Sequence, residues 1–75
     1  VNEIIINNKI HLLYPQKLKV VKKSALEAVV LNSYFKGNYW MIEAEFGNQK
    51  LFFNHFSSLQ KSIIVSLSII KSDQF

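Results

Sequence analysis

Apolar and polar residues alternate along most of the chain with a period of two, which is typical of β-strands. The clearest example runs from residue 39 to residue 46, where every even position is apolar and the odd positions include Glu43 and Glu45. This pattern predicts a strand with one face on a core and the other in water. We expect both glutamates to be exposed on that second face.

Short turn sequences divide the other apolar segments into further strands. Asn7-Asn8, Lys36-Gly37-Asn38 and Gly47-Asn48 contain residue types that tolerate left-handed backbone angles. Pro15 is expected to end a strand, because proline has no N–H to donate to a ladder. Residues 55–62 are expected to form a loop or a turn of 3₁₀ helix, and Lys71–Phe75 to fray. The predicted strands cover residues 3–6, 9–13, 17–22, 26–35, 39–46, 50–54 and 63–70.

Six or seven short strands within 75 residues predict an all-β fold. The chain length fits one domain, residues 1–75, folded as a small OB-like β-barrel of about five to seven short strands that is closed or nearly closed. A barrel of this size needs large residues at its centre. We expect Trp40, Phe46 and either Phe52 or Phe53 to fill it, and Tyr34 to be half exposed.

Composition and charge limit the kinds of site and partner that the chain could have. The absence of cysteine excludes disulfides and cysteine-based metal or redox sites. The net charge of +4 comes from nine lysines without arginine, the residue that makes forked contacts to phosphate and guanine. Nucleic-acid binding is therefore not favoured by charge alone, although lysine can neutralise phosphates. The longest apolar run, residues 63–70, is too short to span a membrane as a helix.

No sequence motif points to catalysis. The chain has neither a glycine-rich phosphate loop nor a G-x-S-x-G nucleophile turn. His11 and His55 lack cysteines or carboxylates at the spacing of metal ligands. The sequence therefore predicts a chain that is not an enzyme, with no catalytic, cofactor-binding or metal-binding residue.

Phe35, Gly37 and Tyr39 form an aromatic-x-Gly-x-aromatic turn between two apolar strands. This turn, within the segment Val30–Trp40, resembles the centre of TOBE domains, the transport-associated OB domains at the C-terminus of ABC-transporter ATPase subunits. Residues 14–20, 49–53 and 63–67 are similar to other parts of the family pattern, so the resemblance covers about residues 9–70. The glycine that the family usually has before the last strand is replaced by Lys61-Ser62, and the Ser-Ala-Arg-Asn stretch through which some relatives bind an oxyanion is absent.

The resemblance implies a regulatory and dimer-contact domain of a bacterial ABC importer, without catalysis of its own. It implies a C-terminal fragment of a longer ATP-binding subunit that lies in the cytoplasm at the inner membrane. The implied partners are an upstream ATPase domain, which would hold ATP and Mg²⁺, a second copy of the subunit, and the permease subunits. A paired barrel needs an exposed apolar surface, for which Ile4–Ile6 and Met41 are candidates. Tyr34, Lys36 and Met41 are candidates for ligand or partner contacts.

A free-standing OB module that binds single-stranded nucleic acid is the alternative function. Its basis is the density of aromatic residues near Lys36 and Lys50, since exposed aromatic side chains beside cations can stack on bases. Core packing accounts for part of the same aromatic cluster. A structural or adaptor domain that binds protein is a third hypothesis, and the sequence does not separate it from the first.

Overall fold

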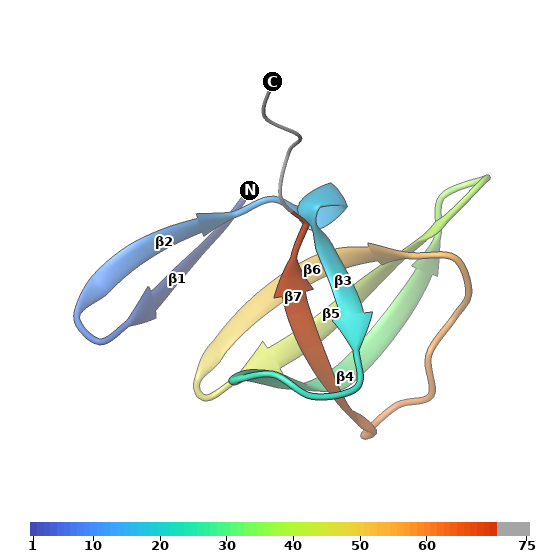
Figure 1. Cartoon of the computed structure of the whole chain (residues 1–75). Helices are drawn as coiled ribbons and strands as arrows, with labels where there is room; N and C mark the ends of the chain where they lie inside the picture. The colour runs from blue at the N-terminus through green and yellow to red at the C-terminus, as the bar shows by residue number, and fades with distance from the viewer. Residues whose placement is uncertain (71–75) are drawn as a thin grey trace.

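The computed structural model describes residues 1–70, which form seven β-strands and one short 3₁₀ helix (Figure 1). The prediction for Lys71–Phe75 lies outside the described residues. Within residues 1–70, no helix is long and apolar enough to cross a membrane. The elements are β1 (Asn2–Ile6), β2 (Lys9–Leu13), η1 (Pro15–Lys17), β3 (Leu18–Val21), β4 (Leu26–Phe35), β5 (Trp40–Phe46), β6 (Gln49–His55) and β7 (Ile64–Ile69).

Five of the strands form one antiparallel sheet in the order β3-β7-β4-β5-β6. Strands β4, β5 and β6 form a meander, and β7 returns to lie between β3 and β4. The long strand β4 pairs with β7 through its first residues and with β5 from Val29 onward, with a register shift between Val30 and Asn32. The predicted small OB-like all-β fold is confirmed, although the sheet is curved rather than closed (Figure 1).

The turns lie where the sequence predicts them. Asn7 and Asn8 both have positive φ, 53° and 64°, and they join β1 to β2 as the two central residues of a tight hairpin turn. Gly37, at φ 104°, lies in the turn between β4 and β5. The N–H of Lys36 donates to the carbonyl of Tyr39 across that turn, at 2.8 Å. Pro15 ends the extended run of β2 and begins η1.

The hairpin of β1 and β2 is a second, two-stranded sheet that packs beside β6 (Figure 1). Cross-strand partners share a face, so each face of the hairpin is defined by the register. The inner face carries Ile4, fully buried, and Leu13, 6% exposed, and both belong to the hydrophobic core. The prediction that Ile4 is part of an exposed contact surface is therefore wrong, because the hairpin folds back and uses this side chain to close the core.

The core lies between the curved sheet and the inner face of the hairpin. Phe53, not Phe52, is its largest fully buried side chain. Trp40 and Phe46 are partly buried and pack against the core from its two ends, so the prediction for them is only half right. The buried apolar residues are Ile4, Leu13, Leu18, Ala28, Val30, Ile42, Ala44, Leu51, Phe53, Val65 and Leu67.

Candidate functional site

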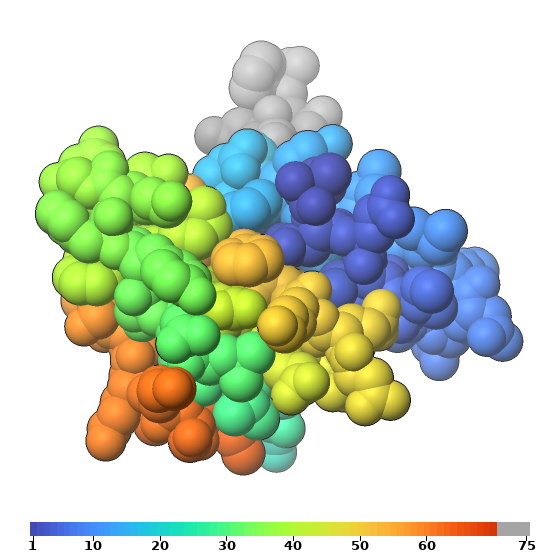
Figure 2. Space-filling view, turned by 180° about the vertical axis from the view of Figure 1, so that it is seen from behind, coloured from blue at the N-terminus to red at the C-terminus, as the bar shows by residue number. Residues whose placement is uncertain are grey.

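A shallow hollow of about 530 Å³ lies between the N-terminal residues and the outer face of the meander. Figure 2 shows this face, with the N-terminal residues in dark blue beside the gold residues of β6 and the green residues of β4. The structure thus brings together the three predicted contact residues Tyr34, Lys36 and Met41. The lining residues are Val1, Asn2, Pro15, Tyr34, Lys36, Met41, Glu43 and Phe52.

The polar centre of the hollow is the carboxylate of Glu43. Its Oε1 atom accepts a hydrogen bond from Asn32 Nδ2 at 3.0 Å and another from the Tyr34 hydroxyl at 2.9 Å. Lys50 Nζ lies 3.4 Å from its Oε2 atom. Asn32 and Phe52 are the register partners of Glu43 on the two neighbouring strands, so the three strands together hold this side chain.

Glu43 is only 9% exposed, so the prediction of a fully solvated glutamate is wrong at this position. It is right for Glu45, which is exposed. The difference arises because Glu43 lies in the middle of the outer face, where Asn32, Tyr34 and Phe52 surround it. The alternation correctly places Glu43 on the outer face. It does not show that side chains of the two neighbouring strands surround Glu43 on that face.

The hydrogen bonds around Glu43 change the acidity of two groups. The pKa of the Glu43 carboxyl lies below its ordinary value, chiefly because Asn32 and then Tyr34 donate to the ionised form. The pKa of the Tyr34 hydroxyl is raised above 10.0, chiefly because it donates to Glu43 and would lose that bond on ionising. The pair is therefore held as a neutral phenol and a carboxylate.

Acid is expected to remove the stabilisation that Glu43 supplies. Its pKa is depressed in the folded chain, so its contribution is fully present above the ordinary value of 4.5 and is lost as the pH falls through the folded pKa. Urea unfolding from neutral pH down to about pH 2 measures this loss. We expect a shallower pH dependence for Glu43→Gln than for the wild type, and a Tyr34 pKa that moves back toward 10.0. Identical curves for the two proteins would contradict this account.

Two carboxamide side chains fasten the hairpin to β6. Asn2 Nδ2 donates to the carbonyl of Phe52 at 2.8 Å, and Asn2 Oδ1 accepts from the N–H of Phe52 at 2.8 Å. In the same way, the Gln49 side chain accepts from the N–H of Ile5 and donates to its carbonyl, at 2.7 and 3.0 Å. Each amide therefore takes the place of a missing strand partner for one residue of the facing strand. A third bond, from Asn2 Nδ2 to the carbonyl of Leu13, links β1 to the end of β2.

The outer face of the hairpin carries apolar side chains that the chain itself leaves uncovered. Ile5 and Ile10 are opposite one another in the register, as are Glu3 and Leu12, so these four side chains share that face. Ile5 is 56%, Ile10 68% and Leu12 53% exposed. Val1 and Tyr14, beside the open end of the hairpin, are also exposed. We call Val1, Ile5, Ile10, Leu12 and Tyr14 the hairpin patch.

The three residues of the aromatic-x-Gly-x-aromatic turn have different environments. Phe35 is 61% exposed at the end of β4, and its ring lies 5.1 Å from that of Trp40. Gly37 has open space around the position where a Cβ would be, so the positive φ, rather than a close approach, explains why glycine suits this turn. Tyr39 is partly buried. Lys36 of this turn and Val1 of the hairpin patch line the same hollow.

The sequence did not single out Asn2, Asn32 and Gln49, whose side chains shape the site through hydrogen bonds, and it placed Glu43 on the correct face but in water. The period-two register of β4 and β5 places Asn32 and Glu43 on one face, and this was the one available signal. Among residues 1–70, no group of three or more histidine, aspartate or glutamate side chains is arranged to hold a metal ion. The arrangement offers contact surfaces and a hydrogen-bonded carboxylate.

Comparison of this chain with models of protein families, with curated proteins and with solved structures found no match.

Proposed function

We propose that this chain is a non-catalytic regulatory and dimer-contact module, and that it belongs to the ATP-binding subunit of a bacterial ABC importer. The observation that carries the contact role is the hairpin patch. Large contiguous apolar surfaces on soluble domains mark sites of protein contact. Here the register places Ile5, Ile10 and Leu12 on one face of a two-stranded sheet, and Val1 and Tyr14 are exposed beside its open end.

The inner face of the hairpin supports the same proposal. Ile4 and Leu13 lie in the core, and the Asn2 and Gln49 amides bind backbone groups across the gap between β1 and β6. The hairpin is therefore held in place before any partner arrives. A preorganised surface loses less conformational entropy on association than a mobile one.

The importer part of the proposal rests on the resemblance of the Phe35-x-Gly37-x-Tyr39 turn and its flanking strands to TOBE domains. Under it, the partners are an upstream ATPase domain, a second copy of the subunit and, through the parent chain, the permease subunits. ATP and Mg²⁺ would be bound by the upstream domain on the cytoplasmic side of the membrane. An ATPase domain with a phosphate loop encoded directly upstream is the expected result, and an unrelated upstream coding sequence would overturn this part.

Self-association through the hairpin patch is tested by sedimentation equilibrium. We expect the 8.7 kDa chain to dimerise weakly, with a dissociation constant on the order of 100 μM, because the patch has five residues, against roughly 20–30 a side in a standard interface. Ile10→Lys places a charge in the patch and is expected to abolish dimerisation.

Ile64→Lys is the matched control, since Ile64 is 67% exposed, against 68% for Ile10, but lies on β7. It is expected to dimerise as the wild type does. A wild-type chain that stays monomeric at millimolar concentration, or an equal loss in both variants, would contradict the contact role.

A further inference from the structure

Four ring-bearing side chains follow one another across the ends of three strands. Phe35 on β4 pairs with Trp40 on β5, and Trp40 pairs with His55 on β6. The Phe35 and Trp40 rings are tilted at 53° with centroids 5.1 Å apart. Phe56 stacks on His55 with centroids 4.4 Å apart and an angle of 28°. We call Phe35, Trp40, His55 and Phe56 the aromatic row.

The two ends of the aromatic row are open to solvent. Phe56 is 86% exposed, the highest value among the large hydrophobic residues of the described chain, and Phe35 is 61% exposed. Single exposed apolar residues are normal on protein surfaces, but each of these two lies against a second ring, Phe35 against Trp40 and Phe56 against His55. The His55 ring is also fixed, because its Nδ1 atom lies 3.0 Å from the carbonyl of Ser57. The row therefore presents two exposed rings, Phe35 and Phe56, each of which lies against a partly buried neighbour.

The charges near the aromatic row are positive. Lys36 follows Phe35 directly, and Lys61 lies in the same loop as Phe56. The sequence has no carboxylate between residues 28 and 42 or between residues 46 and 70. The nearest acidic side chain on β5, Glu43, points to the outer face and is engaged with Asn32, Tyr34 and Lys50. The row therefore suits a ligand that combines flat rings with negative charge.

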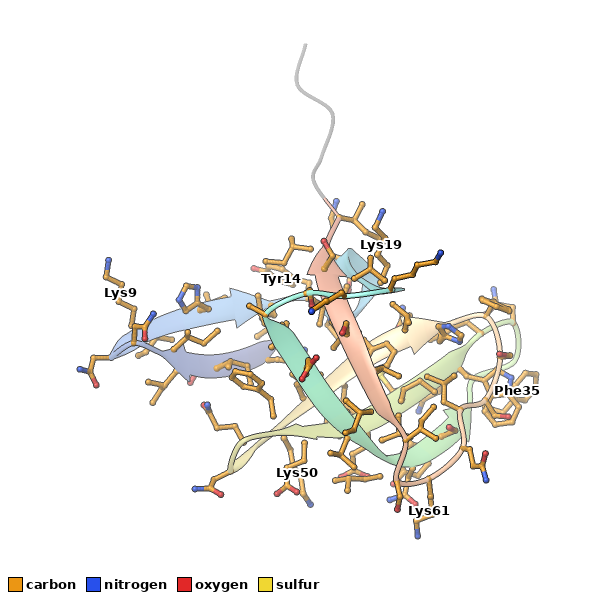
Figure 3. All side chains as sticks on the ribbon, turned by 60° about the horizontal axis from the view of Figure 1, so that its bottom comes forward. Lys9, Tyr14, Lys19, Phe35, Lys50 and Lys61 are labelled. Atoms are coloured by element: carbon orange, nitrogen blue, oxygen red, sulfur yellow. The ribbon has the colours of Figure 1, made fainter. Side chains whose placement is uncertain are left out.

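We propose that the aromatic row is a binding site for single-stranded nucleic acid. Phe35 and Phe56 stack on unpaired bases, and Lys36, which follows Phe35 in the chain and also lines the hollow, neutralises a phosphate beside Phe35. Stacking of this kind accepts every base, because each base has a π-face, so the site binds without sequence preference. The inference does not rest on the dimer-contact role, since the aromatic row shares no residue with the hairpin patch and lies at the other end of the molecule from the tip of the hairpin. Figure 3 shows this separation by the positions of Lys9 and Phe35.

Trp40 reports on this site because it is the only tryptophan of the chain and belongs to the row. The experiment is a fluorescence titration of the whole chain with single-stranded DNA of about ten nucleotides, a length within the range of small single-strand sites. At low salt, we expect quenching of Trp40 with half-saturation in the range of tens of micromolar. The affinity should fall with salt, with a log–log slope of about −0.7 for each phosphate contacted.

Two pairs of variants make the test specific. Phe56→Ala is expected to weaken binding at least about fivefold, as removal of one stacking ring does. Tyr14→Ala removes an exposed aromatic ring outside the row and is expected to leave binding unchanged. Lys36→Gln is expected to reduce the salt slope by about 0.7, because one phosphate contact is lost. Lys9→Gln, at the far tip of the hairpin, is expected to keep the slope of the wild type (Figure 3).

Three other outcomes of these experiments would overturn the proposal. Absence of quenching at low salt excludes the site, as does equal weakening by Phe56→Ala and Tyr14→Ala. A response of Trp40 to a proline-rich peptide, with none to the oligonucleotide, assigns the row to protein binding instead. Circular dichroism of Phe56→Ala separates a loss of binding from a loss of fold, and we expect an unchanged spectrum because the side chain is exposed.

Discussion

Ile4→Ala is expected to destabilise the chain by about 3 kcal/mol, as loss of a fully buried isoleucine side chain does. Ile4 has no exposed surface and joins the hairpin to the core formed by the main sheet. A chain of this length has a total stability on the order of 5 kcal/mol, so this single change removes more than half of it. Urea unfolding followed by circular dichroism measures the effect.

Ile5→Ala is the control, because it makes the same chemical change one residue later on the opposite face. Ile5 is 56% exposed, and its backbone bonds to Gln49 do not depend on its side chain. We expect a loss below about 1 kcal/mol. Similar losses for the two variants would mean that the hairpin does not pack on the core as described.

Asn2→Ala is expected to cost about 3 kcal/mol, because it leaves one buried and two partly buried backbone groups without these partners. Asn2 is 6% exposed, and its amide serves the carbonyls of Leu13 and Phe52 and the N–H of Phe52. Asn2→Asp is expected to be at least as harmful, since a carboxylate would face two carbonyl oxygens. The exchange rate of the Phe52 amide hydrogen reports directly on undocking and should rise in both variants.

Gln49→Ala removes the corresponding pair of side-chain hydrogen bonds toward the other end of β1. It tests whether the burial of such bonds determines how much they stabilise the chain. Its two bonds to Ile5 are exposed, so water can replace them. The expected loss is about 1 kcal/mol. If Gln49→Ala were as damaging as Asn2→Ala, the burial of the Asn2 amide would not be the cause of its importance.

The strands and turns could be predicted because each depends on neighbouring residues. The alternation between residues 39 and 46 defines β5, and asparagine or glycine with positive φ occupies the turns at Asn7-Asn8, Gly37 and Gly47. Strand β4 runs from Leu26 to Phe35, as predicted, although its first residues have helix propensity. Its first residues pair with β7 and its later ones with β5, and these strand pairings outweigh the local helix propensity.

The candidate site was less predictable because it depends on contacts between distant residues. Asn2 and Phe52 are separated by fifty positions, and nothing local indicates that an asparagine amide will replace a strand partner there. The burial of Glu43 likewise depends on β4 and β6 lying on either side of it. Tyr34, Lys36 and Met41 were predicted only as candidates for ligand or partner contacts, and the structure places them in one hollow. The sequence did not indicate that Val1 and Pro15 form its other wall.

The hairpin shows how one strand can carry two roles. Alternate residues of β1 face the core or the solvent, so Ile4 stabilises the fold while Ile5 is available for contact. The run of three isoleucines conceals this division, because all three side chains look equally apolar in the sequence. Only the docking of the hairpin on β6 separates them.

The most direct test of the contact role uses cysteines introduced into a chain that has none. Ile10 and His11 are adjacent exposed residues on opposite faces of β2, so Ile10→Cys and His11→Cys differ only in the face that carries the thiol. Under mild oxidation, measured by non-reducing gel electrophoresis, the account predicts that Ile10→Cys forms covalent dimers much faster than His11→Cys. Equal rates for the two variants, or faster cross-linking at position 11, would contradict it.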